Sequence, residues 1–233
     1  MIDTNSSCKG QTKRAGEAFG NLPIDVTNDL LSVAHTVSYP SSVLLFSELD
    51  QAQRVFVVLE GEIKLSINSR DGRRLILHIA KKGEIVGLAS ALSGKAQEMT
   101  AETLYPAKLA LLSRSDFLAF LLRHPEAYLT LVEELTHQFS KACDQLRNVG
   151  LSSTAPEKLA RLLLEWGENG QISASGTRFH FSLTHQEIGE FIGATRETVT
   201  RTLGEFKSRQ LIAFHGTTLT IPNRIALESY AHC

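Results

Sequence analysis

The stretch Leu183–Phe206, LTHQEIGEFIGATRETVTRTLGEF, predicts two short helices joined by a tight turn. Thr184 followed three residues later by Glu187 is a capping box, in which the hydroxyl and the carboxylate each accept a backbone N–H at the start of a helix. Gly193 marks the turn, and Thr195 is a second N-cap. This order of caps and turn predicts a helix-turn-helix.

The second of these helices has one apolar face and one polar face. Val199, Leu203 and Phe206 recur at steps of four and three, as on a helix that packs against a core. The polar face carries four side chains within two turns: Arg196, Glu197, Thr200 and Arg201. Arginine can donate two hydrogen bonds to guanine, and glutamate can accept one from cytosine. These four residues are predicted to contact DNA bases; a surface helix with solvated charges is the alternative interpretation.

The same stretch resembles the DNA-binding signature of the Crp/Fnr family of bacterial transcription regulators. The pattern T-x-x-E-[IL]-[AG] stands at residues 184–189, and [ST]-R-E-T-[VL]-x-R stands at residues 195–201. Beyond about the first 20 residues the resemblance extends along the chain, through LEGEIKL, a turn at Asp71-Gly72 and KKGEIVG. It implies an α+β fold with an N-terminal antiparallel β-roll (jelly roll), a long dimerisation helix and a C-terminal winged helix-turn-helix.

The resemblance also implies a two-fold DNA site of the TGTGA or TTGA type, and it makes RNA polymerase a further candidate partner. Half-sites are expected about one helical turn, roughly 34 Å, apart. Hydroxyls and amides at helix N-termini suit phosphate anions, although capping alone would also explain the threonines. The predicted phosphate contacts are Thr184, His185, Gln186, Thr195 and Thr198. His185 stands where family members often carry arginine.

Composition limits the class of protein. The 233 residues suit one large or two modest domains, and three widely spaced cysteines form neither a disulfide framework nor a metal-spaced cluster. Without a signal peptide or a membrane-length apolar run, a cytoplasmic protein is expected. Net charge is −1, and residues 151–233 hold eight Lys/Arg against eight Asp/Glu, a balance of zero. The basic footprint usual for DNA binding is missing from that half.

The pattern of apolar residues predicts four regions. Residues 1–19 are expected to be a mobile tail, 20–124 an effector-type β-roll domain, 125–150 a dimerisation helix and 151–233 the winged helix-turn-helix domain. A helical lead-in is predicted at Ile24–Val37. Strands are predicted at Arg54–Leu59, Glu62–Asn68, Leu75–Ile79, Phe179–Leu183, Leu211–Phe214 and Thr217–Ile221, and a hinge at Gly150–Ala155.

The predicted long helix carries a heptad seam. Its apolar residues recur at steps of four and three: Leu135, Phe139, Ala142, Leu146 and Val149. Such a seam is typical of a helix that pairs with a second helix, and a two-fold DNA site needs a two-fold protein. A homodimer is therefore predicted, whereas packing of the stripe on the β-roll of the same chain is the alternative.

The resemblance raises the question of an effector. In members that bind cyclic AMP, a glutamate holds the ribose and an Arg-Ser pair holds the phosphate; Leu88 and Gln97-Glu98 stand at those positions here. Because a neutral amide beside a carboxylate does not attract an anion, cyclic AMP binding is not expected. The residues of the candidate effector pocket are Gly87, Leu88, Ala89, Ser90, Gln97, Glu98, Cys143 and Asp144.

Other effectors and other functions leave weaker traces. An iron–sulfur cluster needs several N-terminal cysteines, and only Cys8 is there; a haem needs axial ligands, and His78 is predicted to be structural. Cys143 is predicted to be a packing residue, with redox sensing as the alternative. The sequence shows neither a nucleophile–base set nor a phosphate-binding loop, so an enzyme is not expected. The rival to DNA binding is a regulatory module whose winged helix contacts protein.

Overall fold

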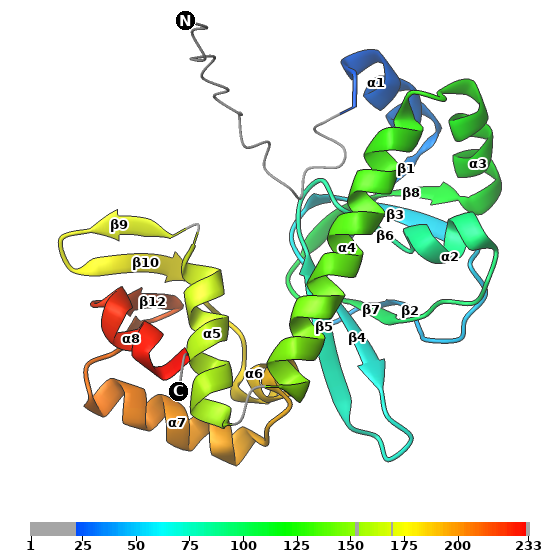
Figure 1. The fold of residues 1–233 in the computed structure, drawn as a ribbon. Coiled ribbons are helices and arrows are strands. Elements are labelled where there is room, and N and C mark those ends of the chain that lie inside the picture. The colour runs from blue at the N-terminus through cyan, green and yellow to red at the C-terminus, as the bar shows by residue number, and fades with distance from the viewer. Residues whose placement is uncertain (1–21, 152–153, 169, 232–233) are drawn as a thin grey trace, which may run out of the picture.

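The computed structural model describes residues 22–151, 154–168 and 170–231. Two lobes lie on either side of a long helix, α4, in Figure 1. The tail predicted at residues 1–19, Cys8 and Cys233, and residues 152–153 of the predicted hinge lie outside the described residues.

The N-terminal lobe is an antiparallel β-roll of two four-stranded sheets, as predicted. One sheet has the order β1-β8-β3-β6, and the other has the order β2-β7-β4-β5. The strands are β1 (His35–Tyr39), β2 (Leu44–Phe46), β3 (Arg54–Glu60), β4 (Ile63–Asn68), β5 (Arg74–Ala80), β6 (Ile85–Val86), β7 (Thr100–Thr103) and β8 (Ala107–Ser113). The apolar residues of the two inner faces fill the roll, among them Phe56, Val58 and Ile63.

The β4–β5 hairpin forms at the predicted turn. Asn68 pairs with Arg74, and Gly72 takes a φ of +81°, which a side chain would strain. Figure 1 shows this hairpin extending from the roll toward the lower end of the molecule.

Four helices pack on the outside of the roll or follow it. They are α1 (Ile24–Val33), α2 (Leu88–Ser93), α3 (Arg114–Arg123) and α4 (Ala127–Gly150). Val55 and Val57, on the outer face of β3, bury the apolar sides of α1 and α3. The lead-in helix predicted to reach Val37 is wrong at its end, because the chain enters β1 at His35 and pairs there with β8.

The C-terminal lobe combines helices α5 (Ala155–Gly167), α6 (His185–Ile192), α7 (Arg196–Ser208) and α8 (Arg224–Ala231) with a sheet of order β11-β12-β10-β9. Its strands are β9 (Gln171–Ser173), β10 (Gly176–His180), β11 (Ala213–His215) and β12 (Thr218–Ile221). The strand predicted at Phe179–Leu183 therefore starts and ends earlier, since Thr177 pairs with Ile221. The hairpin predicted after α7 is β11–β12, whereas β9 and α8 were not predicted.

The two lobes share apolar packing. Ile76, Ile79 and Leu104 of the roll belong to the same buried cluster as the core residues of the C-terminal lobe. Helix α6 lies against β5. Within the described residues, none of the helices has the length and apolar character that crossing a membrane would need.

Candidate nucleic-acid interface

The two helices of the predicted motif are capped as their sequence indicates. The N–H of Glu187 donates to Thr184 Oγ1 over 3.2 Å, and the N–H of Thr184 donates to Glu187 Oε2 over 3.0 Å, so both halves of the capping box are present. Gly193 ends α6 with a φ of +65°, and Thr195 Oγ1 accepts from the N–H of Thr198 to begin α7. These caps set where each helix starts.

Close packing sets the angle between α6 and α7. Ile188, Val199 and Phe206 are buried in the core that α5 completes. A Cβ on Gly189 would lie 2.6 Å from the carbonyl oxygen of Ala194, so no larger residue fits there without moving the turn. The apolar side of the motif is thus held rigidly, and its polar side is left outside.

The four predicted base-contacting residues share the exposed face of α7. Arg196, Glu197, Thr200 and Arg201 are all exposed, within the first two turns of the helix. A hydrogen bond from the N–H of its own residue, followed by one from Thr195, holds the pKa of Glu197 below its usual value. Glu197 therefore stays ionised and can accept hydrogen bonds.

The predicted phosphate-contacting residues lie beside that row. Thr184, His185, Gln186 and Thr195 are exposed, and Thr198 is half-buried. His185 Nδ1 lies 2.8 Å from Thr200 Oγ1, which joins the first helix to the second. The nine residues predicted from the sequence thus lie on the N-terminal parts of two neighbouring helices.

A buried lysine from the roll reaches the same motif. Lys64, on β4, is only 5% exposed, and its Nζ lies 3.2 Å from Glu187 Oε1 and 3.5 Å from Glu102 Oε1. Burial alone would raise the pKa of Glu187, but the hydrogen bonds from Thr184 and the charge of Lys64 outweigh it and lower that pKa. The sequence pattern did not single out Lys64, because a lysine at an alternating position of a strand is usually solvated.

A glutamine of α4 also joins the two lobes. Gln145 Nε2 donates to the carbonyl of Ile76 in β5 over 2.7 Å and to the carbonyl of Phe191 in α6 over 2.5 Å. Tyr105 of the roll is hydrogen-bonded to Ser182, just before α6. Together with Lys64, these contacts hold the first helix of the motif against the roll.

Lys64→Met is expected to destabilise the protein by about 2–4 kcal/mol, because it leaves two partly buried carboxylates without their partner. The midpoint of urea unfolding measures the loss. Lys108→Met is the matched control, since Lys108 is 46% exposed and 4.0 Å from Glu60. Adding Glu187→Gln, which keeps a cap acceptor, should recover part of the loss. Equal effects of the two lysine substitutions would contradict the interpretation.

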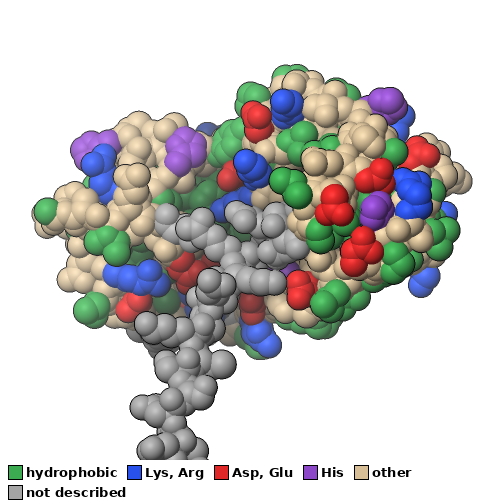
Figure 2. All heavy atoms as spheres, turned by 90° about the horizontal axis from the view of Figure 1, so that it is seen from above, with side chains coloured by type: hydrophobic (Ala, Val, Ile, Leu, Met, Phe, Trp, Pro, Cys, Tyr) green, Lys and Arg blue, Asp and Glu red, His purple; other side chains and the backbone are tan. Residues whose placement is uncertain are grey.

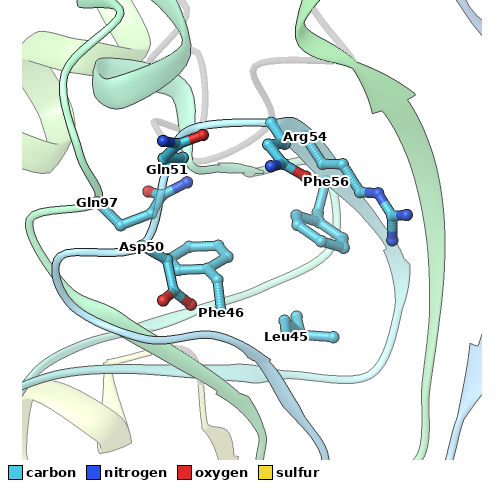
Figure 3. A pocket seen from close by; sticks show the side chains of 8 residues that line it. Leu45, Phe46, Asp50, Gln51, Arg54, Phe56 and Gln97 are labelled. Carbon is cyan, nitrogen blue, oxygen red and sulfur yellow. The ribbon is translucent and has the colours of Figure 1, made fainter.

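A cavity of about 400 Å³ opens into the roll (Figure 3). Its lining residues are Leu45, Phe46, Asp50, Gln51, Gln53, Arg54, Phe56 and Gln97. Gln97 is 4% exposed, and Figure 3 shows its amide facing the same space as the rings of Phe46 and Phe56. The cavity is bounded by the β2–β3 loop on one side and Gln97 on the other.

Only Gln97 of the eight predicted effector-pocket residues lines this cavity. Gly87 lies close by, since a Cβ there would be 3.5 Å from Gln97 Nε2. Leu88 is buried in the cluster that packs against α1 and α3. On α4, Asp144 is exposed and pairs with Arg147, and Cys143 is half-buried. Of the remaining predicted residues, Ala89 and Ser90 lie in α2, and Glu98 lies just before β7.

Known proteins resemble the chain in both lobes. Residues 36–124 match the model of the cyclic nucleotide-binding domain, and residues 157–230 match the Crp-like helix-turn-helix domain. The transcriptional activatory protein AadR of Rhodopseudomonas palustris is 30% identical over 77% of this chain and 74% of its own length. The chain belongs to the Crp/Fnr family of transcription regulators. As predicted, its relatives are regulators and not enzymes.

Two further comparisons place this Crp/Fnr regulator. The cAMP-activated global transcriptional regulator CRP of Pasteurella multocida is 24% identical over 82% of this chain and 91% of its own length. The structure of FixK2 from Bradyrhizobium japonicum superposes with a TM-score of 0.75 at 24% identity, covering 86% of this chain and 98% of that one. The second likeness shows the shared fold.

The roll of this Crp/Fnr chain meets α4 through buried polar groups. Glu134 is 3% exposed, and Gln138 Nε2 donates to Glu134 Oε1 and to the carbonyl of Ile85. Glu84 accepts a 2.6 Å hydrogen bond from His78. Burial, reinforced by the charge of Glu84, raises the pKa of Glu134, and burial lowers the pKa of His137 on the same helix.

Glu134→Gln is expected to raise the melting temperature near pH 7.5. Because the pKa of the Glu134 carboxyl is raised by folding, the folded protein loses stability as the pH rises from the unfolded-state pKa of 4.5 through the folded-state pKa. The variant should therefore gain over the natural protein at neutral pH and lose that gain toward pH 4.5, as measured by calorimetry at several pH values. Exposed Glu133→Gln should show no such trend. A pH-independent difference would reject burial of the charge as its cause.

The opposite side of α4 is apolar and open to solvent. Phe139 is 70% exposed and Leu146 is 63% exposed, while Leu135, Ala142 and Val149 are half-buried. The same steps of four and three continue backwards to exposed Val132 and Tyr128. Of the predicted seam, Phe139 and Leu146 are therefore left open to solvent, whereas Leu135 packs against the buried cluster of the roll.

Proposed function

We propose that this Crp/Fnr regulator is a homodimer that binds a two-fold DNA site in a sequence-specific way. The observation that carries the proposal is the exposed row Arg196, Glu197 and Arg201 on the first two turns of α7. A helix of this kind enters the major groove with its N-terminal residues toward the base edges. Two arginines and one glutamate match a half-site containing G·C pairs, of the TGTGA or TTGA type.

Phosphate contacts would come from the residues around the two helix N-termini. Thr184 and Thr195 at the start of α6 and α7 are exposed, helix N-termini favour anions, and regulators of this family bind DNA through this motif. His185, Gln186 and Thr198 extend the same surface. Because His185 is already bonded to Thr200, its contribution would depend on breaking that bond or on donating from the other ring nitrogen.

A second copy of the chain is the partner that fits the apolar stripe on α4. The residues at heptad spacing run for three heptads from Tyr128 to Val149, along a helix of 24 residues. Solvated large apolar residues in a continuous row mark an interaction surface, and regulators of this family act as dimers. The dimer would place two copies of α7 on one side of the molecule.

The effector of this regulator is proposed not to be cyclic AMP. Leu88 stands where a ribose-binding carboxylate is expected by resemblance, and it is buried in the core outside the cavity. Gln97 offers a neutral amide where a cation is expected, and Glu98 follows it. Gln97 and Glu98 would therefore supply no cation to a cyclic phosphate, and the cation among the residues that line the cavity, Arg54, comes from β3 instead. A melting-temperature shift on adding millimolar cyclic AMP would reject this part of the proposal.

Selection from a random pool of duplexes at physiological salt tests DNA binding. The expected result, with protein alone, is a two-fold motif with G·C pairs at fixed spacing. Residues 151–233 carry no net charge, and Figure 2 shows side chains of both charges on the face seen from above, so non-specific attraction to DNA should be weak. No enrichment, with or without cell extract, would reject the proposal and favour a winged helix that contacts protein.

A further inference from the structure

The tip of the β4–β5 hairpin carries a group of arginines that the helix-turn-helix does not use. Residues 69–74, SRDGRR, contain three arginines and one aspartate, a net charge of +2. Arg70 and Arg73 are exposed, and among the described residues Arg70 has no hydrogen-bond or ion-pair partner. Arg73 donates to Asp71 through Nε only, so the other N–H groups of its guanidinium remain available.

A continuous row of charged contacts links this hairpin to the first helix of the DNA-binding motif. Arg74 Nη1 lies 3.1 Å from Glu102 Oε2, and Glu102 in turn contacts Lys64. Lys64 contacts Glu187, whose carboxylate caps α6. The base of the hairpin is thus a few side chains from the predicted phosphate contacts, and Figure 1 shows the hairpin tip and α7 at the same lower end of the molecule.

The hairpin lies on the side of α4 away from the proposed dimer partner. Gln138 and Gln145 face the roll, since they donate to Ile85 and Ile76, while the residues next to them, Phe139 and Leu146, face solvent. A second copy packed on that stripe would leave the two hairpins on the outside. When the two copies of α7 occupy the two half-sites, only the DNA that lies outside the half-sites would reach the hairpins.

We propose that Arg70 and Arg73 bind phosphates of the DNA that flanks each half-site on its outer side. The inference rests on the proposed function. It also accounts for the missing basic footprint, since residues 151–233 carry no net positive charge and the hairpin of the other lobe supplies it. Arginine side chains on a protruding turn can follow the backbone without reading its sequence, so they add affinity rather than specificity.

The test compares Arg70→Gln/Arg73→Gln with the natural chain on two duplexes carrying the selected two-fold site. One duplex ends at the outer base pair of each half-site, and the other extends about ten base pairs, one helical turn, beyond it. The matched control is Lys82→Gln/Lys95→Gln. It removes the same charge from exposed residues, of which Lys82 follows the far end of β5. Affinity is measured from about 50 to 300 mM salt, the range over which phosphate contacts weaken.

On the long duplex the hairpin variant should bind more weakly than the control. Its plot of log affinity against log salt should be less steep by about 3 to 4, since each of four phosphate contacts in a dimer adds about 0.9. On the short duplex the two variants should coincide. Equal salt slopes on the long duplex would overturn the inference and point instead to an acidic protein as partner of the hairpin. Failure of the natural chain to prefer the site on either duplex would reject the proposed function itself.

Discussion

Leu146→Glu is expected to leave a folded monomer whose affinity for the two-fold site is about 10²–10⁴-fold lower, because the second half-site is no longer bound by a linked subunit. Leu146 is 63% exposed in a single chain, so the substitution does not disturb its own core. In a dimer the same position would face its symmetry mate, and two glutamates would be buried against each other. Sedimentation equilibrium measures the mass, and a mobility-shift titration measures the affinity.

Ser140→Glu is the matched control for this prediction. Ser140 is exposed on the same helix but lies outside the heptad seam, so the added charge should remain in solvent. The control should remain a dimer and bind DNA as the natural chain does. A Leu146→Glu protein that stays dimeric, or a natural chain that is monomeric at micromolar concentration, would refute the assignment of the α4 stripe.

Arg196→Ala/Arg201→Ala is expected to abolish discrimination between the selected site and scrambled DNA. Each bidentate arginine–guanine contact contributes about 1–3 kcal/mol, so losing both should cost about 2–6 kcal/mol per half-site. Arg201→Ala alone should cost about 1–3 kcal/mol and relax specificity at one base pair. Both side chains are exposed, and the apolar face of α7 is untouched, so the fold should be retained. Competition binding with labelled duplexes measures the loss.

A pair of arginines elsewhere in the same domain separates base reading from charge. Arg178→Ala/Arg224→Ala removes the same two charges from β10 and α8, and neither side chain belongs to α7. This control should keep its preference for the selected site. If the α7 variant weakens binding to scrambled DNA as much as to the selected site, then Arg196 and Arg201 contact phosphates and do not read bases.

Local patterns were sufficient to predict much of the molecule. The capping box at Thr184 and Glu187, the turn at Gly193 and the hairpin turn at Gly72 depend on neighbours within four residues, and each is found as predicted. The apolar steps along α4 include Phe139 and Leu146, which the rest of the chain leaves exposed, and their role in a dimer stays a prediction. Such features follow from helix and strand periodicity. The family and the α+β architecture were predicted from the resemblance of residues 184–201 to the Crp/Fnr signature.

Other features depend on residues distant in the chain. Alternation along β4 puts Ile63 and Leu65 on one face, and both are buried, but the pattern carries no sign that Lys64 on the other face is buried too. Lys64 is buried because α6, more than 100 residues later, covers that face of the sheet and supplies Glu187. In the same way Gln145 is one polar residue among many on α4 until β5 and α6 bring two backbone carbonyls to it.

The sequence alone was therefore enough to predict most of the elements, their caps and a set of residues proposed to contact DNA, since these depend on local periodicity and hydrogen-bonding groups. Only the tertiary structure decided which polar residues join the two lobes, where the cavity opens and that Arg74 of the hairpin is connected through Glu102 and Lys64 to the DNA-binding motif. Burial and charge pairing depend on what another part of the chain places within a few ångströms, and a one-dimensional pattern does not contain that information.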